Sequence, residues 1–477
     1  MSSTSTEDST CAASDFMIKN DTTLTPKSLE ASAKKVFEAS APKILSLQKR
    51  WKESDGTPVF TIEGKYTSRG WTEWTEGFVY GSAILQYDAT GDESMLQIGR
   101  EGTLRRMAAH VTHIGVHDHG FNNVSTYGNL RRLLHEGRLL SNEWESHFYD
   151  LALKASGAVQ ASRWTQLTPE LGYIRSFNGP QSLFSDTIRS LRALSLAHVL
   201  GHRLMGENDA NINLLHRSLQ HAETTARYNV YYGKGRDTYD VPGRVVHESI
   251  FNVTDGAYRC PSTQQGYSAF TTWTRGHAWV LCGFPEQYEF LELLPESEFK
   301  DFGGKQKILD RYLEVARVTA DFYLRETPTD GIPYWDTGAP GLVHLGDYLN
   351  RPAEPFNEHE PVDSSAAAIS AQGLLRLARI LEKKGDKKAA QTYLAAGLTT
   401  ARTLFSEPYL SSDPKHEGLL LHTVYHRPNG WDHIPKGRKV PCGEAAMWGD
   451  YHLRELALYL LRLAGGKPYL TFFGEKL

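Results

Sequence analysis

Cysteine is scarce in this chain of 477 residues, and none of its four cysteines lies in a C-x-x-C pair. Structural zinc sites and thiol redox centres use such closely spaced pairs, so the sequence indicates neither. A disulfide framework is typical of much shorter secreted chains. We therefore expect free thiols at Cys11, Cys260, Cys282 and Cys442.

Runs of like charge and long apolar runs are also missing. The 52 Lys and Arg residues against 56 Asp and Glu give a net charge of −4 without a basic patch, so no nucleic-acid partner is indicated. No stretch is apolar and long enough to span a bilayer. Residues 1–15 lack the basic start and apolar centre of a secretory signal. We expect a soluble cytoplasmic protein, monomeric or weakly oligomeric, with a disordered tail (1–25) and one domain (26–477).

Apolar side chains recur every three or four residues in about twelve segments, which is the spacing of amphipathic helices. Strand signals are weak except at 245–253, where we predict a short hairpin closed near 254–256. The predicted helices are 28–51, 73–88, 93–113, 121–137, 143–160, 185–204, 210–230, 273–291, 304–326, 364–383, 386–406 and 444–464.

The unusual polar and aromatic sequences lie at the starts of every second helix. Trp74, Asp118, Asp186, Arg275 and Trp448 all occupy such positions. A solenoid would show a repeat of fixed length, and none is present. If the helices alternate in direction, these starts meet at one end of the molecule. The pattern therefore predicts an all-α fold, an (α/α)6 barrel with a functional cavity at one end.

Two isolated aspartates, Asp118 and Asp186, each stand where a polar segment meets a predicted helix. Paired carboxylates are the usual groups that cleave sugar linkages. Asp is also a favoured helix N-cap, because its side chain accepts backbone N–H bonds at the helix start. Both interpretations stay open for each aspartate at this point.

Aromatic and polar residues around the eighth predicted helix are candidates for binding a sugar acid. The guanidinium of Arg275 can bind a carboxylate through two hydrogen bonds, or it can pair with a buried acid of the protein. Trp273 and Trp279 offer flat apolar faces, and the amide of Gln265 can hold a hydroxyl or a water. His247 is a lone histidine, a residue that is more often structural.

Cofactor motifs are absent. The histidines at 117, 119, 247 and 277 show neither H-x-x-x-H nor H-E-x-x-H spacing, so we predict no metal site. There is no P-loop, no dinucleotide-binding fingerprint and no serine nucleophile elbow. We expect an enzyme that works without a cofactor.

Taken together, the motifs resemble those of the unsaturated glucuronyl hydrolases, glycoside hydrolase family 88. The resemblance runs from about Trp71 to the C-terminus, and the order and spacing of the motifs make it specific. It rests on the segments 74–78, 117–122, 186–187, 265–268, 273–279, 331–336, 363–365 and 448–451.

The resemblance implies the family's (α/α)6 barrel and its chemistry. Such enzymes hydrate the C4=C5 double bond of a terminal unsaturated uronic acid, and this hydration releases the rest of the saccharide. The residue matching Asp186 would give a proton to C4 and take one from water. Asp118 would orient the ring and modulate Asp186. Because a general acid must be protonated near neutral pH, we expect the pKa of Asp186 to be raised.

The resemblance also implies contacts with substrate or water. Five residues would surround the reacting sugar, and two aromatic residues would form a platform for it. These residues are His247, Gln265, Trp273, Arg275 and Trp279, with Trp74 and Phe78 as the platform.

The sequence departs from the family pattern at several places. His277 stands where Gln is usual, and 187–191 replaces a Met-Met-Asn segment. These departures leave the aspartate pair intact, but they leave the neighbouring sugar and its sulfation unassigned. Three alternatives stay open: a non-catalytic sugar-binding barrel, a conventional glycosidase, and a rhamnogalacturonyl hydrolase or an enzyme acting on another glucuronide.

Overall fold

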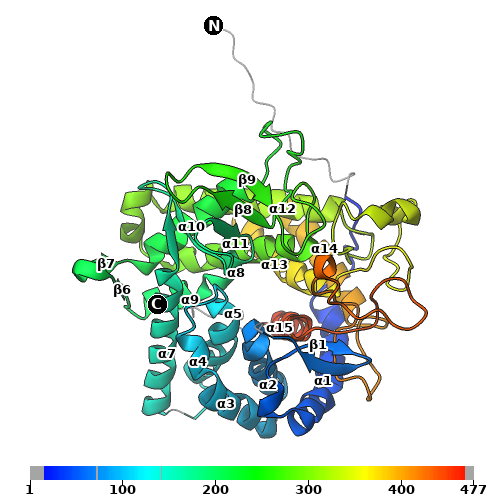
Figure 1. The fold of residues 1–477 in the computed structure, drawn as a ribbon. Helices are drawn as coiled ribbons and strands as arrows, with labels where there is room; N and C mark the ends of the chain where they lie inside the picture. The colour runs from blue at the N-terminus through cyan, green and yellow to red at the C-terminus, as the bar shows by residue number, and fades with distance from the viewer. Residues whose placement is uncertain (1–15, 71–72, 141, 468–477) are drawn as a thin grey trace.

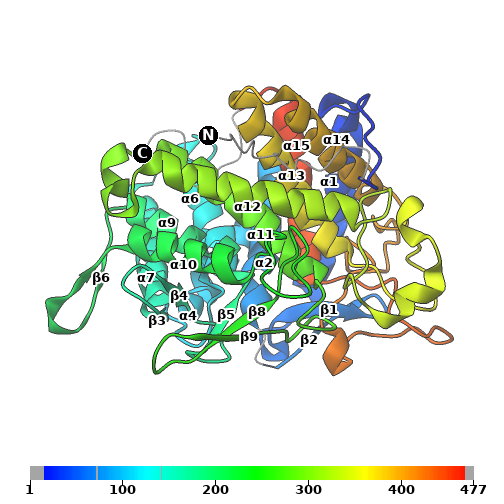
Figure 2. The same ribbon diagram turned by 90° about the horizontal axis from the view of Figure 1, so that it is seen from above.

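The computed structural model describes residues 16–70, 73–140 and 142–467 as two concentric rings of helices (Figures 1 and 2). The inner helices are α2 (Glu76–Thr90), α5 (His119–Asn123) with α6 (Asn129–His135), α8 (Thr187–Ser190) with α9 (Arg192–Val199), α11 (Thr274–Leu293), α13 (Ser364–Lys383) and α15 (Met447–Ala464). The outer helices are α1 (Glu30–Arg50), α3 (Glu93–Arg106) with α4 (Ala108–Val111), α7 (Glu143–Ser162), α10 (Leu214–Tyr228), α12 (Lys305–Arg325) and α14 (Lys387–Leu404).

The inner ring closes on itself. In order round the ring, α2 contacts α5, α5 contacts α8, and the contacts continue through α11, α13 and α15 back to α2. Outer helices α3, α12 and α14 each pack on the inner helix next to them in sequence. Each of the twelve predicted segments corresponds to a helix or to two helices in tandem. The predicted (α/α)6 barrel is confirmed.

Burial explains which helices lie inside. α13 is buried on nearly all its sides, whereas α12 keeps one polar face in solvent. A helix that is apolar all round belongs in a core, and an amphipathic one belongs at the surface. Small residues let the inner helices approach closely. A Cβ atom on Gly373 of α13 would stand 2.5 Å from the Leu281 carbonyl oxygen of α11.

Short strands lie between the helices, and the sequence indicated only one pair of them. The expected hairpin is β8 with β9, and β5 pairs with β8 just ahead of Asp186. Strands of two to five residues carry too little periodicity to be recognised. The strand pairs are β1 (Pro58–Ile62) with β2 (Lys65–Ser68), β3 (Trp164–Gln166) with β4 (Gly172–Ile174), β5 (Ser182–Phe184) with β8 (Glu248–Phe251), β8 with β9 (Tyr258–Ser262), and β6 (Leu204–Met205) with β7 (Asn211–Ile212).

Part of the segment that was expected to be a disordered tail is ordered. Residues 16–25 are held on the barrel, so the prediction of disorder is wrong for them, and residues 1–15 lie outside the described part of the chain. The Met17 amide donates to the Leu324 carbonyl at 2.9 Å, and Ile18 is buried. Asp21 pairs with Arg402 at 2.8 Å. Polar composition suggested disorder, but one apolar residue and backbone hydrogen bonds anchor the segment.

Two further observations concern the described residues. Cys260, Cys282 and Cys442 are free thiols, whereas Cys11 lies outside this part of the chain. None of the helices described here is long and apolar enough to cross a membrane.

Candidate active site

A cavity opens where the inner helices begin. The starts of α5, α8 and α11 reach it, as the alternation of helix directions predicted. Aromatic side chains form most of its wall, and the two aspartates are its acids. Its lining residues are Trp74, Val116, His117, Asp118, Phe121, Phe177, Phe184, Asp186, Gln264, Gln265, Trp273, Arg275, Trp279, Tyr425, His426, Asn429 and Trp431.

Asp118 and Asp186 occupy N-cap positions without acting as caps. Asp118 precedes α5 and Asp186 precedes α8, yet neither side chain accepts a hydrogen bond from its helix. Asp363, in contrast, caps α13 by accepting from the Ser365 amide at 3.0 Å. Asp363 is therefore an N-cap, whereas the N-cap interpretation is wrong for the pair. Both carboxylates of the pair are buried and face the cavity.

A missing side chain at Gly120 brings the two aspartates together. A Cβ atom there would overlap the Ser190 carbonyl oxygen, so α5 and α8 touch through their backbones. The Gly120 amide also donates to Ser190 Oγ at 3.0 Å. Asp118 lies two residues before Gly120, and Asp186 lies four residues before Ser190. This close approach therefore sets the position of each acid relative to the other.

His117 lies between the two carboxylates. Its Nε2 is 3.1 Å from Asp186 Oδ1 and 3.7 Å from Asp118 Oδ1. The ring is buried against Phe177 and Phe184. Two hydrogen bonds to its own carbonyl fix the residue, one from Gln160 Nε2 and one from Ser190 Oγ, each at 2.6 Å.

This arrangement shifts the pKa values of Asp118, Asp186 and His117 in different directions. Burial raises the pKa of Asp118, and His117 opposes that rise only in part. Burial also acts to raise the pKa of Asp186, but His117 outweighs it, so the pKa of Asp186 is lowered. Burial acts to lower the pKa of His117, but Asp118 and Asp186 outweigh it and raise that pKa. The expected rise at Asp186 is therefore not found, because His117 bonds to that carboxylate.

The guanidinium of Arg275 makes its hydrogen bonds and its ion pair with other groups of the protein. Its Nη1 pairs with Asp363 at 2.9 Å, and its Nη2 donates to Gln265 Oε1 and to the Tyr425 carbonyl, each at 2.8 Å. It also donates to the Val424 carbonyl. The guanidinium therefore pairs with a buried acid, as one of the two sequence interpretations held. It joins the start of α13 to the loop before α15.

Most of the predicted binding residues meet at the cavity. Trp74, Gln265, Trp273 and Trp279 line it together with the acids and Arg275. Since Gln265 Oε1 accepts from Arg275, its amide nitrogen is the group left to donate to a ligand.

Phe78 and His247 lie behind the lining. Phe78 is fully buried with its ring 5.9 Å from that of Trp74, so it packs behind the wall, and its predicted role in the substrate platform stays a prediction. His247 packs between Phe184 and Trp273. Its Nδ1 accepts from the Gln264 amide at 3.0 Å, which leaves Nε2 as the protonated nitrogen. Burial lowers the pKa of His247 to about 4, so the ring is neutral at pH 7.

Sequence reasoning missed several lining residues. Among the individual candidates, His117 was considered only as a possible metal ligand. Tyr425, His426, Asn429 and Trp431 come from the connection between α14 and α15, whose length was the only available signal. No three His, Cys, Asp or Glu side chains in the described ranges are grouped as a metal ion would require.

Several known proteins are similar to this chain over most of its length. No family model matches the chain. The unsaturated glucuronyl hydrolase of Bacillus sp. strain GL1 is 27% identical over 418 residues, covering 85% of this chain and 90% of the relative. The unsaturated chondroitin disaccharide hydrolase of Streptococcus pyogenes is 26% identical over 420 residues, covering 86% of each.

Solved structures match over a similar span. The crystal structure of the Bacillus sp. GL1 enzyme aligns with a TM-score of 0.64 and 25% identity over 90% of this chain and 95% of its own. The chain is thus similar in sequence and in fold to unsaturated glucuronyl hydrolases over most of its length. An unsaturated glucuronyl hydrolase specific for heparin has the same fold, with a TM-score of 0.68 and 20% identity over 91% of this chain and 97% of its own.

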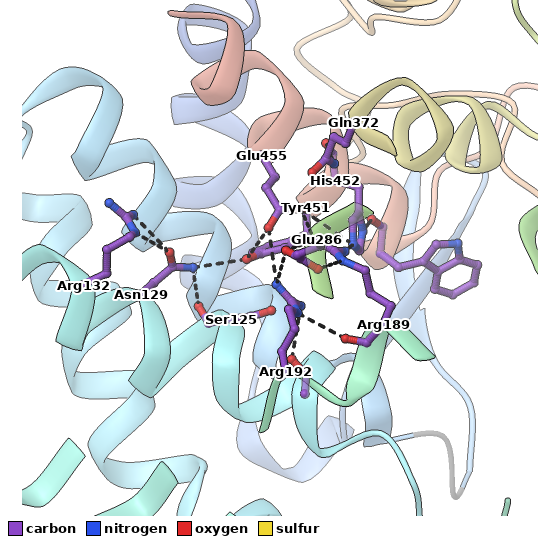
Figure 3. A network of polar contacts seen from close by, with 12 residues as sticks. Ser125, Asn129, Arg132, Arg189, Arg192, Glu286, Gln372, Tyr451, His452 and Glu455 are labelled. Carbon is purple, nitrogen blue, oxygen red and sulfur yellow. Dashed lines mark hydrogen bonds and ion pairs between the residues drawn. The ribbon is translucent and has the colours of Figure 1, made fainter. Parts of the chain in front are cut away.

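The structure places two departures from the unsaturated glucuronyl hydrolase pattern. His277 faces α12, where its ring lies 5.2 Å from that of Phe322, away from the cavity. Arg189, one turn after Asp186, enters a buried ionic network inside the barrel (Figure 3). It pairs with Glu286 at 2.7 Å and with Glu455 at 3.1 Å. In this chain, charged groups thus fill the barrel beneath the cavity.

Proposed function

We propose that the protein hydrolyses oligosaccharides that end in an unsaturated uronic acid, by adding water across the C4=C5 double bond. The observation that carries the proposal is the pair of buried carboxylates at Asp118 and Asp186, which face an aromatic cavity without capping their helices. A non-catalytic sugar-binding barrel needs the aromatic wall, but it gains nothing from two desolvated acids.

The cavity suits an anionic sugar. Trp74, Trp273 and Trp279 offer apolar faces to a ring. α11 begins at the cavity without a side-chain cap, so the positive end of its helix dipole favours a carboxylate there. The amide of Gln265 is oriented by Arg275 and supplies a donor. These features together suit a saccharide with a terminal unsaturated uronate as the substrate.

The reaction follows from the polarity of the double bond. The ring oxygen is attached to C5, so C4 accepts a proton readily and the positive charge that develops at C5 is shared with that oxygen. Asp186 gives the proton to C4, and water bonds to C5 while its proton passes to Asp186. The hemiketal then opens, and the hemiacetal formed at C1 releases the rest of the saccharide. One water is consumed, and Asp186 ends as it began.

The test is spectroscopic. The conjugated double bond of the uronate absorbs in the ultraviolet, so turnover of a lyase-digested polysaccharide should remove that absorbance. Digests of heparin, chondroitin, gellan and pectin would cover the neighbouring sugars. If the double bond persists in all four digests, the proposal is wrong and a binding role or another glycosidase activity takes its place.

A further inference from the structure

We propose that His117 is a positioning residue, one that holds the proton which Asp186 delivers to C4 and takes it back after water has added. The inference rests on the hydration reaction proposed above. It starts from the geometry of one buried ring whose Nε2 faces two carboxylates, at 3.1 Å and 3.7 Å.

Charge balance favours a cation at this position. Two ionised carboxylates in a buried site are costly unless a positive group compensates them. The substrate adds a third carboxylate when it binds. An imidazolium at His117 reduces the negative charge of the three-residue cluster from −2 to −1. It thereby allows a uronate to approach Asp118 and Asp186.

The surrounding groups single out His117 among the nearby histidines. The charged and titratable groups that face it are Asp118, Asp186, Arg163, His221 and His247. Burial lowers the pKa of His221 to about 3 and that of His247 to about 4, so both are neutral at pH 7. Arg163 disfavours a proton on His117, but the two carboxylates outweigh it, and the pKa of His117 is raised.

The proton steps balance. In the resting site the proton is on His117 Nε2 and both aspartates are ionised. It moves along the hydrogen bond to Asp186 Oδ1, which leaves a neutral imidazole. The π electrons of C4=C5 then form the C4–H bond with that proton. Water bonds to C5, its proton goes to the Asp186 carboxylate, and that proton returns to His117. The site regains its initial charge after each turnover.

The distinguishing measurement is the pH profile of kcat/KM for His117→Gln. Because the pKa of His117 is raised, the imidazole is protonated at low pH and loses its proton as the pH rises through that pKa. Without His117, Asp186 must take its proton from solvent. We expect turnover to fall about 10²-fold at neutral pH and to recover towards acid pH, since losing a proton-transfer group typically costs that much.

A matched control is His119→Gln. His119 is equally buried and bonds to Ser156 Oγ and to the His113 carbonyl, away from the carboxylates. The His119→Gln variant should keep the shape that the pH profile of kcat/KM has in the unsubstituted protein. Two results would overturn the proposal: an unchanged profile in His117→Gln, or an equal loss at every pH in a folded variant, which is the mark of a structural role.

A titration by NMR of the imidazole nitrogens decides the same point without turnover. We expect the His117 midpoint to lie above the ordinary histidine value of 6.5 and to fall in Asp186→Asn. A midpoint below 6.5, or one that Asp186→Asn leaves in place, contradicts the proposal even if His117→Gln does not fold. If the protein consumes no double bond at all, the proposed function fails, and the titration still reports whether His117 holds the proton.

Discussion

Asp186 is the residue on which the proposed reaction depends, because it must both give and receive a proton at the sugar. An amide of the same shape cannot do this. Asp186→Asn should therefore lower kcat by about 10² to 10⁴-fold, the usual cost of losing a general acid or base. Substrate binding, measured by calorimetry, should survive. Near-normal turnover in the folded variant would move the acid role elsewhere, with Asp118 the first residue to test.

Asp118→Asn provides the comparison for that variant. Asp118 is buried beside the same histidine, and its charge acts on both His117 and Asp186. The substitution should also reduce turnover, but it should in addition displace the pH profile, because a neighbouring negative charge raises the proton affinity of an acid. A loss of turnover without a displaced profile would assign Asp118 a role in orienting the ring.

A further prediction at the residue scale concerns Arg275. Its guanidinium is saturated by Asp363, Gln265 and two backbone carbonyls, so its removal leaves a buried carboxylate without its cation. Breaking a buried pair in this way costs about 3–5 kcal/mol. Urea unfolding of Arg275→Ala should show a free energy of unfolding lower by that amount. Weakened substrate binding at unchanged stability would instead show that Arg275 serves the substrate directly.

Among the elements, the contact between α5 and α8 is the one that sets the acid pair. Gly120→Ala would push a methyl group into the Ser190 carbonyl, and overpacking of this kind costs about 1–3 kcal/mol. Because the helices can relieve the overlap only by separating, kcat should fall by more than ten-fold, since small displacements of reacting groups are costly.

Gly128→Ala is the control for that prediction. Gly128 lies in the π-helical turn between α5 and α6 (Val124–Gly128), where a new Cβ would meet the movable Val124 side chain at 3.1 Å. The activity of the Gly128→Ala variant should stay near that of the unsubstituted protein. Equal activity in the two variants would show that the Gly120 contact does not set the catalytic geometry.

The sequence predicts the elements well and the contacts between them poorly. Helical periodicity and the position of Trp74, Asp118, Asp186 and Arg275 at alternate helix starts located the cavity. The role proposed for His117 could not be predicted, because it depends on a distance to Asp186, a residue 69 positions away.

Two further features of the site also depend on tertiary contacts. The aromatic at Phe78 matches a binding motif, but the packing of Trp74 over it places it behind the wall, so its role towards a substrate stays a prediction. The loop carrying Trp431 lacks any periodic signal. In each case the deciding fact is a tertiary contact, which local sequence does not encode.

At the scale of the whole molecule, a buried ionic network joins helices on opposite sides of the barrel. Arg189 and Arg192 of α8 and α9 face Glu286 of α11 and Glu455 of α15 (Figure 3). Burial acts to raise the pKa of Glu455, but the arginines outweigh it and lower that pKa from 4.5 to about 2. The charged form therefore stabilises the folded barrel.

This shift gives a prediction for acid stability. A carboxyl group whose pKa is lowered by folding contributes stability above its unfolded value and loses it as the pH falls, here between 4.5 and about 2. Glu455→Gln should lose about 3–5 kcal/mol at neutral pH, because its arginines stay buried. It should also flatten the acid limb of stability against pH, measured by urea unfolding. The exposed Glu170→Gln should change neither, and an unchanged acid limb in Glu455→Gln would contradict this role of the network.

The most direct test of the account uses an unsaturated uronide linked to its neighbour through carbon instead of oxygen. Hydration of C4=C5 does not require the anomeric bond to break. The account therefore predicts that the protein removes the ultraviolet absorbance of this analogue, and that Asp186→Asn does not. If the absorbance persists while the oxygen-linked substrate is cleaved, the enzyme attacks the anomeric carbon and the hydration mechanism is wrong.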